Sequence, residues 1–109
     1  RYAFINGSRR AMIMSKPWRK GATKMEYGRI VATRGIADEM EGDPIFSREI
    51  DAAFRRYQAR DWGDLCQEDK ELNDQAVNGG ERILAAYSTS KGTIWIITEW
   101  DRSATTFLK

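Results

Sequence analysis

Apolar residues recur at three- and four-residue spacing along residues 44–60, at Phe46, Ile50, Ala53, Phe54 and Tyr57. This spacing places the apolar side chains on one side of a helix, so the pattern predicts an amphipathic helix over residues 44–60. Asp43 precedes it as a favoured N-cap, and Pro44 suits the first helical position, where the N–H that proline lacks has no partner. One face of this helix is therefore expected to pack against the body of the protein.

A second helix is predicted over residues 67–78. Asp64 and Gln67 have the spacing of a capping box at its start, and the Gly79-Gly80 pair can end it, because glycine adopts the left-handed conformation at low cost. The apolar residues of this segment, Leu72, Ala76 and Val77, make only a thin stripe. We therefore expect this helix to lie half exposed.

The β-branched residues of segment 29–33 predict a short strand, and Thr33 can cap a helix that follows it directly over residues 34–41. Three further strands are predicted over residues 81–88, 93–100 and 103–109, with turns at residues 90–92 and 101–102. In the middle one, Ile94 and Ile96 point one way and Trp95 and Ile97 the other, as in a central strand with helices on at least one side. The expected fold is α+β: an antiparallel sheet of three to four strands, including this C-terminal meander, with two to three helices packed mainly on one face.

The length of 109 residues suits one domain with one modest core. The longest apolar run, residues 94–97, is far shorter than the roughly 20 residues that span a bilayer, so no membrane partner and a cytoplasmic location are expected. Cys66 is the one cysteine, which excludes an internal disulfide and fits a reducing compartment.

Charge is distributed unevenly. Residues 1–24 hold seven Lys or Arg and no acid, out of 18 basic and 16 acidic residues in the chain. Residues 25–109 therefore hold eleven basic and sixteen acidic residues, which gives this part a net charge of about minus five. This predicts a basic arm over residues 1–24, extended or loosely packed, before a single α+β domain over residues 25–109. The arm is either a solvated extension or a nucleic-acid contact, since Arg and Lys attract phosphates and Trp stacks on bases. The candidate contacts are Arg9, Arg10, Lys16, Trp18, Arg19 and Lys20.

The composition disfavours most enzyme classes. Histidine is absent, which removes the commonest general base near neutral pH and the commonest zinc ligand. No glycine-rich phosphate loop of the Walker or dinucleotide type is present. Asp61 or Asp64 beside Glu99 could hold Mg²⁺, but carboxylates are also common helix caps and surface residues. We therefore expect a protein without cofactor, metal or catalytic residues.

Two short segments stand out as candidate binding sites. In DWGDL, Trp62 between Asp61 and Asp64 is either a contact residue in a loop or a plug of the core with the two acids capping helix ends. In TEWDRS, residues 99–102 either form a simple turn or recognise a partner, since Trp and Arg are overrepresented among residues that carry binding energy. The predicted partner-binding residues are Asp61, Trp62, Asp64, Glu99, Trp100, Asp101 and Arg102.

The segments GRIVATRG, DWGDL, EDKELND, RILAAY and IWIITEWDRSATTFL, in this order and spacing, resemble a family of short bacterial proteins of mobile elements, described as hypothetical or plasmid-related. The resemblance covers about residues 27–109. Family members typically continue into an acidic tail and lack a basic arm, so this chain departs from them at both ends.

The resemblance implies a non-enzymatic binding protein of a phage or plasmid. Its sharpest form is an inhibitor of a host defence system, of the anti-CRISPR or antirestriction type, that docks on a bacterial defence protein or complex through charge complementarity. The alternative is a nucleic-acid-binding regulatory protein that uses the basic arm.

Overall fold

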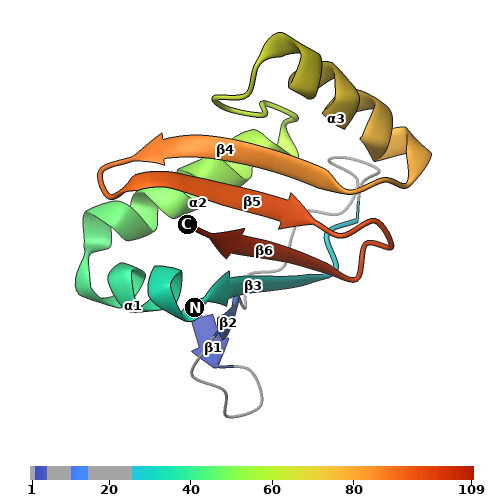
Figure 1. Cartoon of the computed structure of the whole chain (residues 1–109). Coiled ribbons are helices and arrows are strands. Elements are labelled where there is room, and N and C mark those ends of the chain that lie inside the picture. Colours follow the sequence, from blue (N-terminus) through green and yellow to red (C-terminus); the bar gives the residue numbers. More distant parts are fainter. Residues whose placement is uncertain (1, 5–10, 15–25) are drawn as a thin grey trace.

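The computed structural model describes residues 2–4, 11–14 and 26–109. Its elements follow the chain as β1 (Tyr2–Phe4), β2 (Ala11–Met14), β3 (Arg29–Thr33), α1 (Arg34–Gly42), α2 (Pro44–Gln58), α3 (Gln67–Gly79), β4 (Ile83–Thr89), β5 (Gly92–Thr98) and β6 (Ala104–Leu108). The fold is α+β, as predicted, and the three helices and one sheet are arranged as in Figure 1. No helix in the described ranges is both long and apolar enough to cross a membrane.

The sheet is mixed, so the expectation of an antiparallel sheet is wrong at one pair. Its strand order is β1-β2-β3-β6-β5-β4, and β3 runs parallel to β6 while every other pair is antiparallel. The four strands of the predicted domain are thus joined by β1 and β2 from the predicted arm. A parallel neighbour needs a long crossover, and here all three helices lie in the chain between β3 and β6.

Gly28 explains how β3 fits beside the start of β6. Its φ of 65° lies in the left-handed region, and a Cβ there would overlap the backbone of Arg102 and Ser103. The next residue is held against the same segment, because Arg29 N donates a hydrogen bond to Ser103 O at 3.1 Å. The close approach of two backbones therefore requires glycine at this position.

The core lies between the sheet and the helices. Alternate strand residues contribute Ile30, Ile83, Ile94, Ile96 and Phe107, all buried. The predicted stripe of α2 meets them, with four of its five residues buried and Phe54 packed partly buried against the cluster. In Figure 1, α2 passes behind β4 and β5, whereas α3 lies beyond the outer edge of β4.

The helix boundaries test the capping predictions. Asp43 accepts hydrogen bonds from Ile45 N and Phe46 N at 2.9 and 3.2 Å, so it caps α2 as predicted. Thr33 occupies the N-cap position of α1 without a side-chain cap bond. The predicted capping box of α3 is wrong: its N-cap residue is Cys66, and the Asp64 carboxylate accepts from Ser88 Oγ instead.

Helix α3 is held mainly by hydrogen bonds. Its buried residues are Asn73 and Ala76, while Leu72, predicted to lie on the inner stripe, is 54% exposed. Asn73 Nδ2 donates to Leu84 O at 2.8 Å, and Leu84 N donates to Asn73 Oδ1 at 3.4 Å. One amide side chain therefore covers the outer edge of β4 as a neighbouring strand would.

Candidate functional site

The turn between β5 and β6, residues 99–103, carries the most exposed aromatic side chain among the described residues. Trp100 is 66% exposed. We call these five residues the Trp100 turn. It lies at one end of the sheet, while the hairpin that joins β4 to β5 lies at the other (Figure 1).

Backbone hydrogen bonds set the shape of the Trp100 turn. Glu99 N donates to Ala104 O at 3.0 Å, and Arg102 N donates to Glu99 O at 2.9 Å. Arg102 has a φ of 60°, in the left-handed region that residues with a Cβ seldom adopt. The surroundings must hold such a residue in place.

The Arg102 guanidinium supplies that restraint. It donates to Glu81 O at 2.6 Å, to Glu99 O at 3.2 Å and to Ala76 O at 2.7 Å. The last of these carbonyls belongs to the final turn of α3, where a positive charge is favourable. Arg102 therefore ties the turn to α3 and to Glu81, two residues before β4, and these donors point to the protein itself.

Asp101 also closes the turn. Its carboxylate accepts from Ser103 N at 3.0 Å. The hydroxyl and then the backbone N–H of Ser103 lower the pKa of Asp101 below its usual value. Asp101 is exposed, so a fixed negative charge stands next to Trp100 at neutral pH.

A buried chain of hydroxyl groups fixes the sheet beneath the turn. Thr105 Oγ1 donates to Tyr27 O at 2.7 Å, so its oxygen must accept from Thr98 Oγ1 at 2.8 Å. Thr98 in turn accepts from the Tyr57 hydroxyl at 2.7 Å. The hydroxyl groups thus all donate in one direction, from Tyr57 through Thr98 and Thr105 to the carbonyl of Tyr27. Burial raises the pKa of Tyr57 well above its usual range.

The structure separates the second predicted segment from this turn. Trp62 is buried at 2% exposure and its Nε1 donates to Asp74 Oδ1 at 2.9 Å, so the prediction of a surface contact at Trp62 is wrong and the alternative of a core plug is confirmed. Its ring packs edge-on against Tyr57. A partner cannot reach this indole in the present conformation.

The two acids beside Trp62 also have partners within the chain. Asp61 forms an ion pair with Arg56 at 2.8 Å, and the hydrogen bond from that arginine lowers the pKa of Asp61 below its usual value. Asp64 N donates to Ala86 O at 2.8 Å. Neither acid caps a helix, and together with Gly63 they fasten the loop to the edge of β4.

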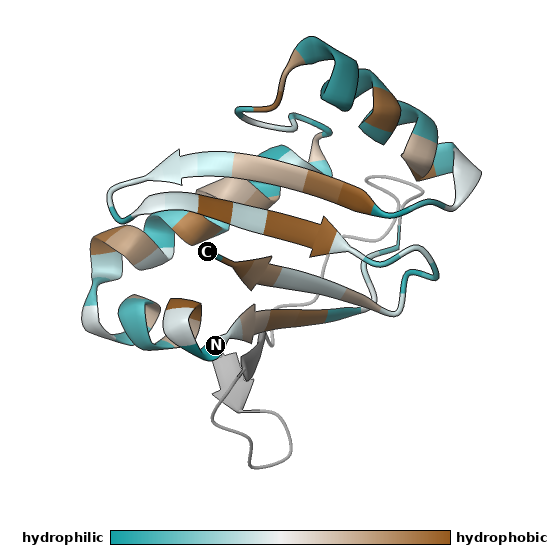
Figure 2. Cartoon of the chain, in the orientation of Figure 1, coloured by the Kyte–Doolittle hydropathy of each residue, from teal (hydrophilic) through white to brown (hydrophobic). Residues whose placement is uncertain are grey.

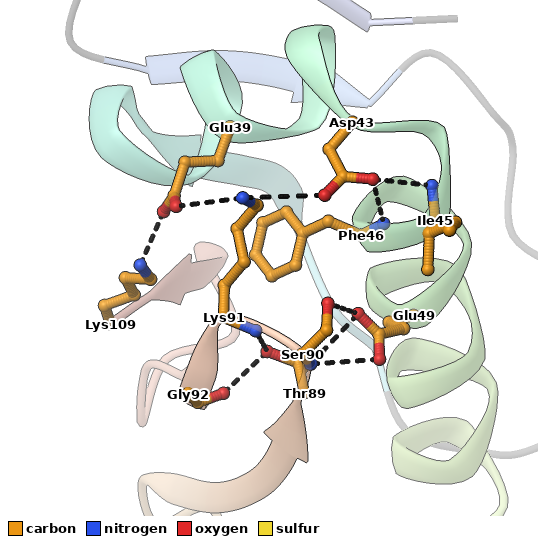
Figure 3. Close-up of polar contacts among 10 residues, drawn as sticks. All are labelled: Glu39, Asp43, Ile45, Phe46, Glu49, Thr89, Ser90, Lys91, Gly92 and Lys109. Carbon is orange, nitrogen blue, oxygen red and sulfur yellow. Dashed lines mark hydrogen bonds and ion pairs between the residues drawn. The ribbon is translucent and has the colours of Figure 1, made fainter.

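Contacts at the opposite end of the sheet were not anticipated from the sequence. Figure 3 shows the tip of the β4–β5 hairpin meeting the junction of α1 and α2. Ser90 donates to the Glu49 carboxylate through its N–H and its hydroxyl, and Lys91 lies 3.5 Å from Asp43 Oδ2. We call the whole group the hairpin latch; it comprises Glu39, Asp43, Glu49, Ser90, Lys91 and Lys109. Its members come from four separate segments, which is why no local motif predicted it.

The remaining predictions concern metals and the basic arm. Within residues 2–4, 11–14 and 26–109, no group of three or more His, Cys, Asp or Glu is placed to hold a metal ion. The six residues proposed for nucleic-acid contact, Arg9, Arg10, Lys16, Trp18, Arg19 and Lys20, lie outside the described residues. Their role stays a prediction.

No protein-family model, curated protein or solved structure matches the chain. Function is therefore inferred from the geometry of the molecule and from the resemblance of its sequence segments.

Proposed function

We propose that this protein is a non-enzymatic binding protein whose Trp100 turn docks on another protein. The observation that carries the proposal is the pairing of an exposed tryptophan with a turn held in one shape. Trp100 is 66% exposed, although the backbone on both sides of it is fixed by hydrogen bonds and by the Arg102 guanidinium.

The physical reason is the cost of ordering. A flexible loop that becomes fixed on binding loses conformational entropy, whereas a side chain presented from a fixed turn loses little. Tryptophan is among the residues that most often carry binding energy at interfaces. The neighbouring acids Glu99 and Asp101 would give such a contact a preference for a basic partner surface.

The resemblance to proteins of mobile elements supports a sharper form of the proposal. In this form the partner is a bacterial defence protein or complex, and docking inhibits it in the manner of an anti-CRISPR or antirestriction protein. The net charge of about minus five over residues 25–109 favours a basic surface on the partner. That charge is too small for general mimicry of DNA, so a local docking patch is required.

The test compares Trp100→Ala with Ile45→Ala in bacteria that carry active CRISPR or restriction systems. Ile45 is the matched control, because it is 62% exposed and lies at the hairpin latch, at the opposite end of the sheet. Expression of the native chain should raise the survival of an infecting phage or incoming plasmid. Trp100→Ala should abolish this effect, and Ile45→Ala should retain it.

A pull-down with the same three proteins identifies the partner. A defence protein retained by the native chain and by Ile45→Ala, but lost with Trp100→Ala, supports the proposal. Equal retention by all three proteins contradicts it. Recovery of nucleic acid alone, released by salt and lost when the basic residues of segment 1–24 are neutralised, would establish the alternative of a nucleic-acid-binding regulator.

A further inference from the structure

Helix α3 contributes less to the core than either of the other two helices. It buries Asn73 and Ala76, whereas α1 buries three residues and α2 buries five. Val77 packs partly buried against the core cluster, and Asp74 accepts from Trp62 Nε1 at 2.9 Å. Figures 1 and 2 show α3 beyond the outer edge of β4, with a largely hydrophilic surface. An element with few buried apolar contacts opens at a lower free energy than the fold as a whole, so α3 is the helix that can leave most easily.

The two buried residues of α3 hold different parts of the molecule. Asn73 exchanges two hydrogen bonds with the backbone of Leu84 and so fastens the helix to the edge of β4. Ala76 O accepts from the Arg102 guanidinium at 2.7 Å and so fastens the Trp100 turn to the helix. Residues three apart lie on the same side of a helix and move with it. Ala76 O therefore keeps its place only while Asn73 stays on β4.

The Arg102 guanidinium depends on α3 for two of its three acceptors. Ala76 O belongs to the helix, and Glu81 O belongs to the link from α3 to β4, which is tied to the helix because Glu81 N donates to Ala76 O at 3.4 Å. The third acceptor, Glu99 O, lies within the turn at 3.2 Å, the longest of the three contacts. Arg102 has a left-handed backbone, which persists only when the surroundings hold it. Departure of α3 would remove most of that restraint.

We propose that α3 positions the Trp100 turn, with Asn73 as the positioning residue. While Asn73 holds α3 against β4, the Arg102 guanidinium is held and Trp100 is presented from a turn of one shape. When α3 leaves the edge, the guanidinium is released and the turn samples other shapes. Coupling of this kind is reciprocal, so a protein bound to the fixed turn holds α3 in place. This role regulates docking only if the proposed function holds, whereas the coupling itself is a property of the free protein.

Native-state hydrogen exchange of the full chain, followed by NMR in increasing urea below the unfolding transition, tests the coupling. The reporters are the amides of Asn73 and Ala76 in α3, those of Glu99 and Arg102 in the turn, and the central amides of α2. We expect the α3 and turn amides to share one opening reaction at a lower urea concentration than the α2 amides. Turn amides that open separately from α3 would overturn the proposal. A single opening shared by all the reporters, at global unfolding, would equally overturn it.

The variant Asn73→Ala and its control Glu49→Ala extend the test. Each removes a side chain that holds one end of the sheet, because Glu49 accepts from the N–H and hydroxyl of Ser90 in the hairpin latch. Relative to the α2 amides, Asn73→Ala should speed exchange at Glu99 and Arg102 by at least about tenfold, and Glu49→Ala should not. Equal acceleration at the turn and in α2 would mean a general loss of stability and would exclude the positioning role. The sample contains no partner, so failure of the proposed docking would leave these outcomes unchanged.

Discussion

The two ends of the sheet are built differently, although each brings a turn against a helix. At the hairpin latch, ion pairs and hydrogen bonds join the tip to α1 and α2, and the neighbouring Phe46 is fully buried. At the Trp100 turn, the Arg102 guanidinium, the Asp101 carboxylate and two backbone hydrogen bonds hold the backbone, and the neighbouring Trp100 stays mostly in solvent. The first end closes the core, and the second presents a side chain that the core does not use.

The difference shows that the backbone of a turn can be held in one conformation without burial of its side chains. At the hairpin latch the polar contacts surround the buried ring of Phe46, so the same contacts fix the tip of the β4–β5 hairpin and cover the core. At the Trp100 turn, Arg102 helps to fix the backbone through three carbonyl groups while Trp100 stays 66% exposed. Rigidity without burial is what a preformed binding element requires.

The largest effect is expected from Arg102→Ala. The substitution leaves the carbonyls of Ala76, Glu81 and Glu99 without the guanidinium donors, and we expect a loss of about 2–4 kcal/mol in the free energy of unfolding. Urea denaturation measures it. Arg102→Gly removes the same contacts but relieves the strain of φ 60°, so it should cost about 1 kcal/mol less. Equal losses would show that backbone strain contributes nothing at this turn.

The second largest effect is expected from acid, which should weaken the hairpin latch. The backbone N–H of Phe46, followed by Ile45 N and Lys91, lowers the pKa of Asp43 below its usual 3.8. A carboxyl group whose pKa is lower in the folded chain than in the unfolded chain stabilises the fold at pH values above its unfolded-state pKa. This contribution is lost as the pH falls through its folded-state pKa. Stability should therefore fall below about pH 4.

Thermal unfolding followed by circular dichroism between pH 2 and 7 measures this loss. Asp43→Asn is the matched variant, because asparagine also caps helices but carries no charge. Its stability should depend less on pH below 4 than that of the native chain. The same slope in both proteins would place the acid sensitivity elsewhere, for instance at Asp61 or Asp101, whose pKa values are also lowered.

Lys91→Met should have a smaller effect. The ammonium group lies 3.5 Å from Asp43 and 4.0 Å from Glu39, and about a third of the lysine side chain is exposed. Pairs of this kind contribute about 0.2–1 kcal/mol, so we expect a loss in that range when the charge is removed and the stem is kept. The loss should shrink in 1 M NaCl because salt screens exposed charges. A salt-independent loss would instead indicate packing of the stem.

Trp100→Ala should have the smallest effect on folding. Because the indole is mostly in solvent, the free energy of unfolding should change by no more than about 0.5 kcal/mol. Chemical denaturation monitored at a far-ultraviolet wavelength is suitable, since it does not depend on tryptophan emission. A loss above about 2 kcal/mol would mean that Trp100 supports the fold, and it would remove the basis of the proposed docking role.

The parts of the fold that follow from neighbouring residues could be predicted. Asp43 and Pro44 mark the start of α2, the residues of β3 match the predicted strand, and Gly80 ends α3 with a φ of 74°. Each of these signals acts within a few residues of the chain, so no knowledge of the tertiary structure is needed.

Features that depend on distant residues could not be predicted. The parallel pairing of β3 with β6 requires Gly28 to meet residues 102–103, which are more than 70 positions away. Asp64 bonds Ser88 instead of capping α3, because the edge of β4 lies beside it. Asn73 replaces Leu72 on the inner side of α3 for the same reason, since the edge offers backbone donors and acceptors that leucine cannot satisfy.

The candidate site shows the same division. The sequence marks the Trp100 turn as a place where binding residues could gather, but it does not distinguish an inward Arg102 from an outward Trp100. That distinction depends on the carbonyls of Ala76 and Glu81, which come from other elements. Trp62 has acidic neighbours as Trp100 does, yet the core and Asp74 enclose it.

The amide of Asn73 has a consequence for solubility in a crowded cell. An uncovered strand edge recruits strands from other molecules, and this is a common first step toward fibrils. Here an intruding strand would have to displace both hydrogen bonds of Asn73 and the contact of Gly63 with Ala86 before it could add to β4. A helix that buries little of its own surface thus acts as a guard against uncontrolled polymerisation.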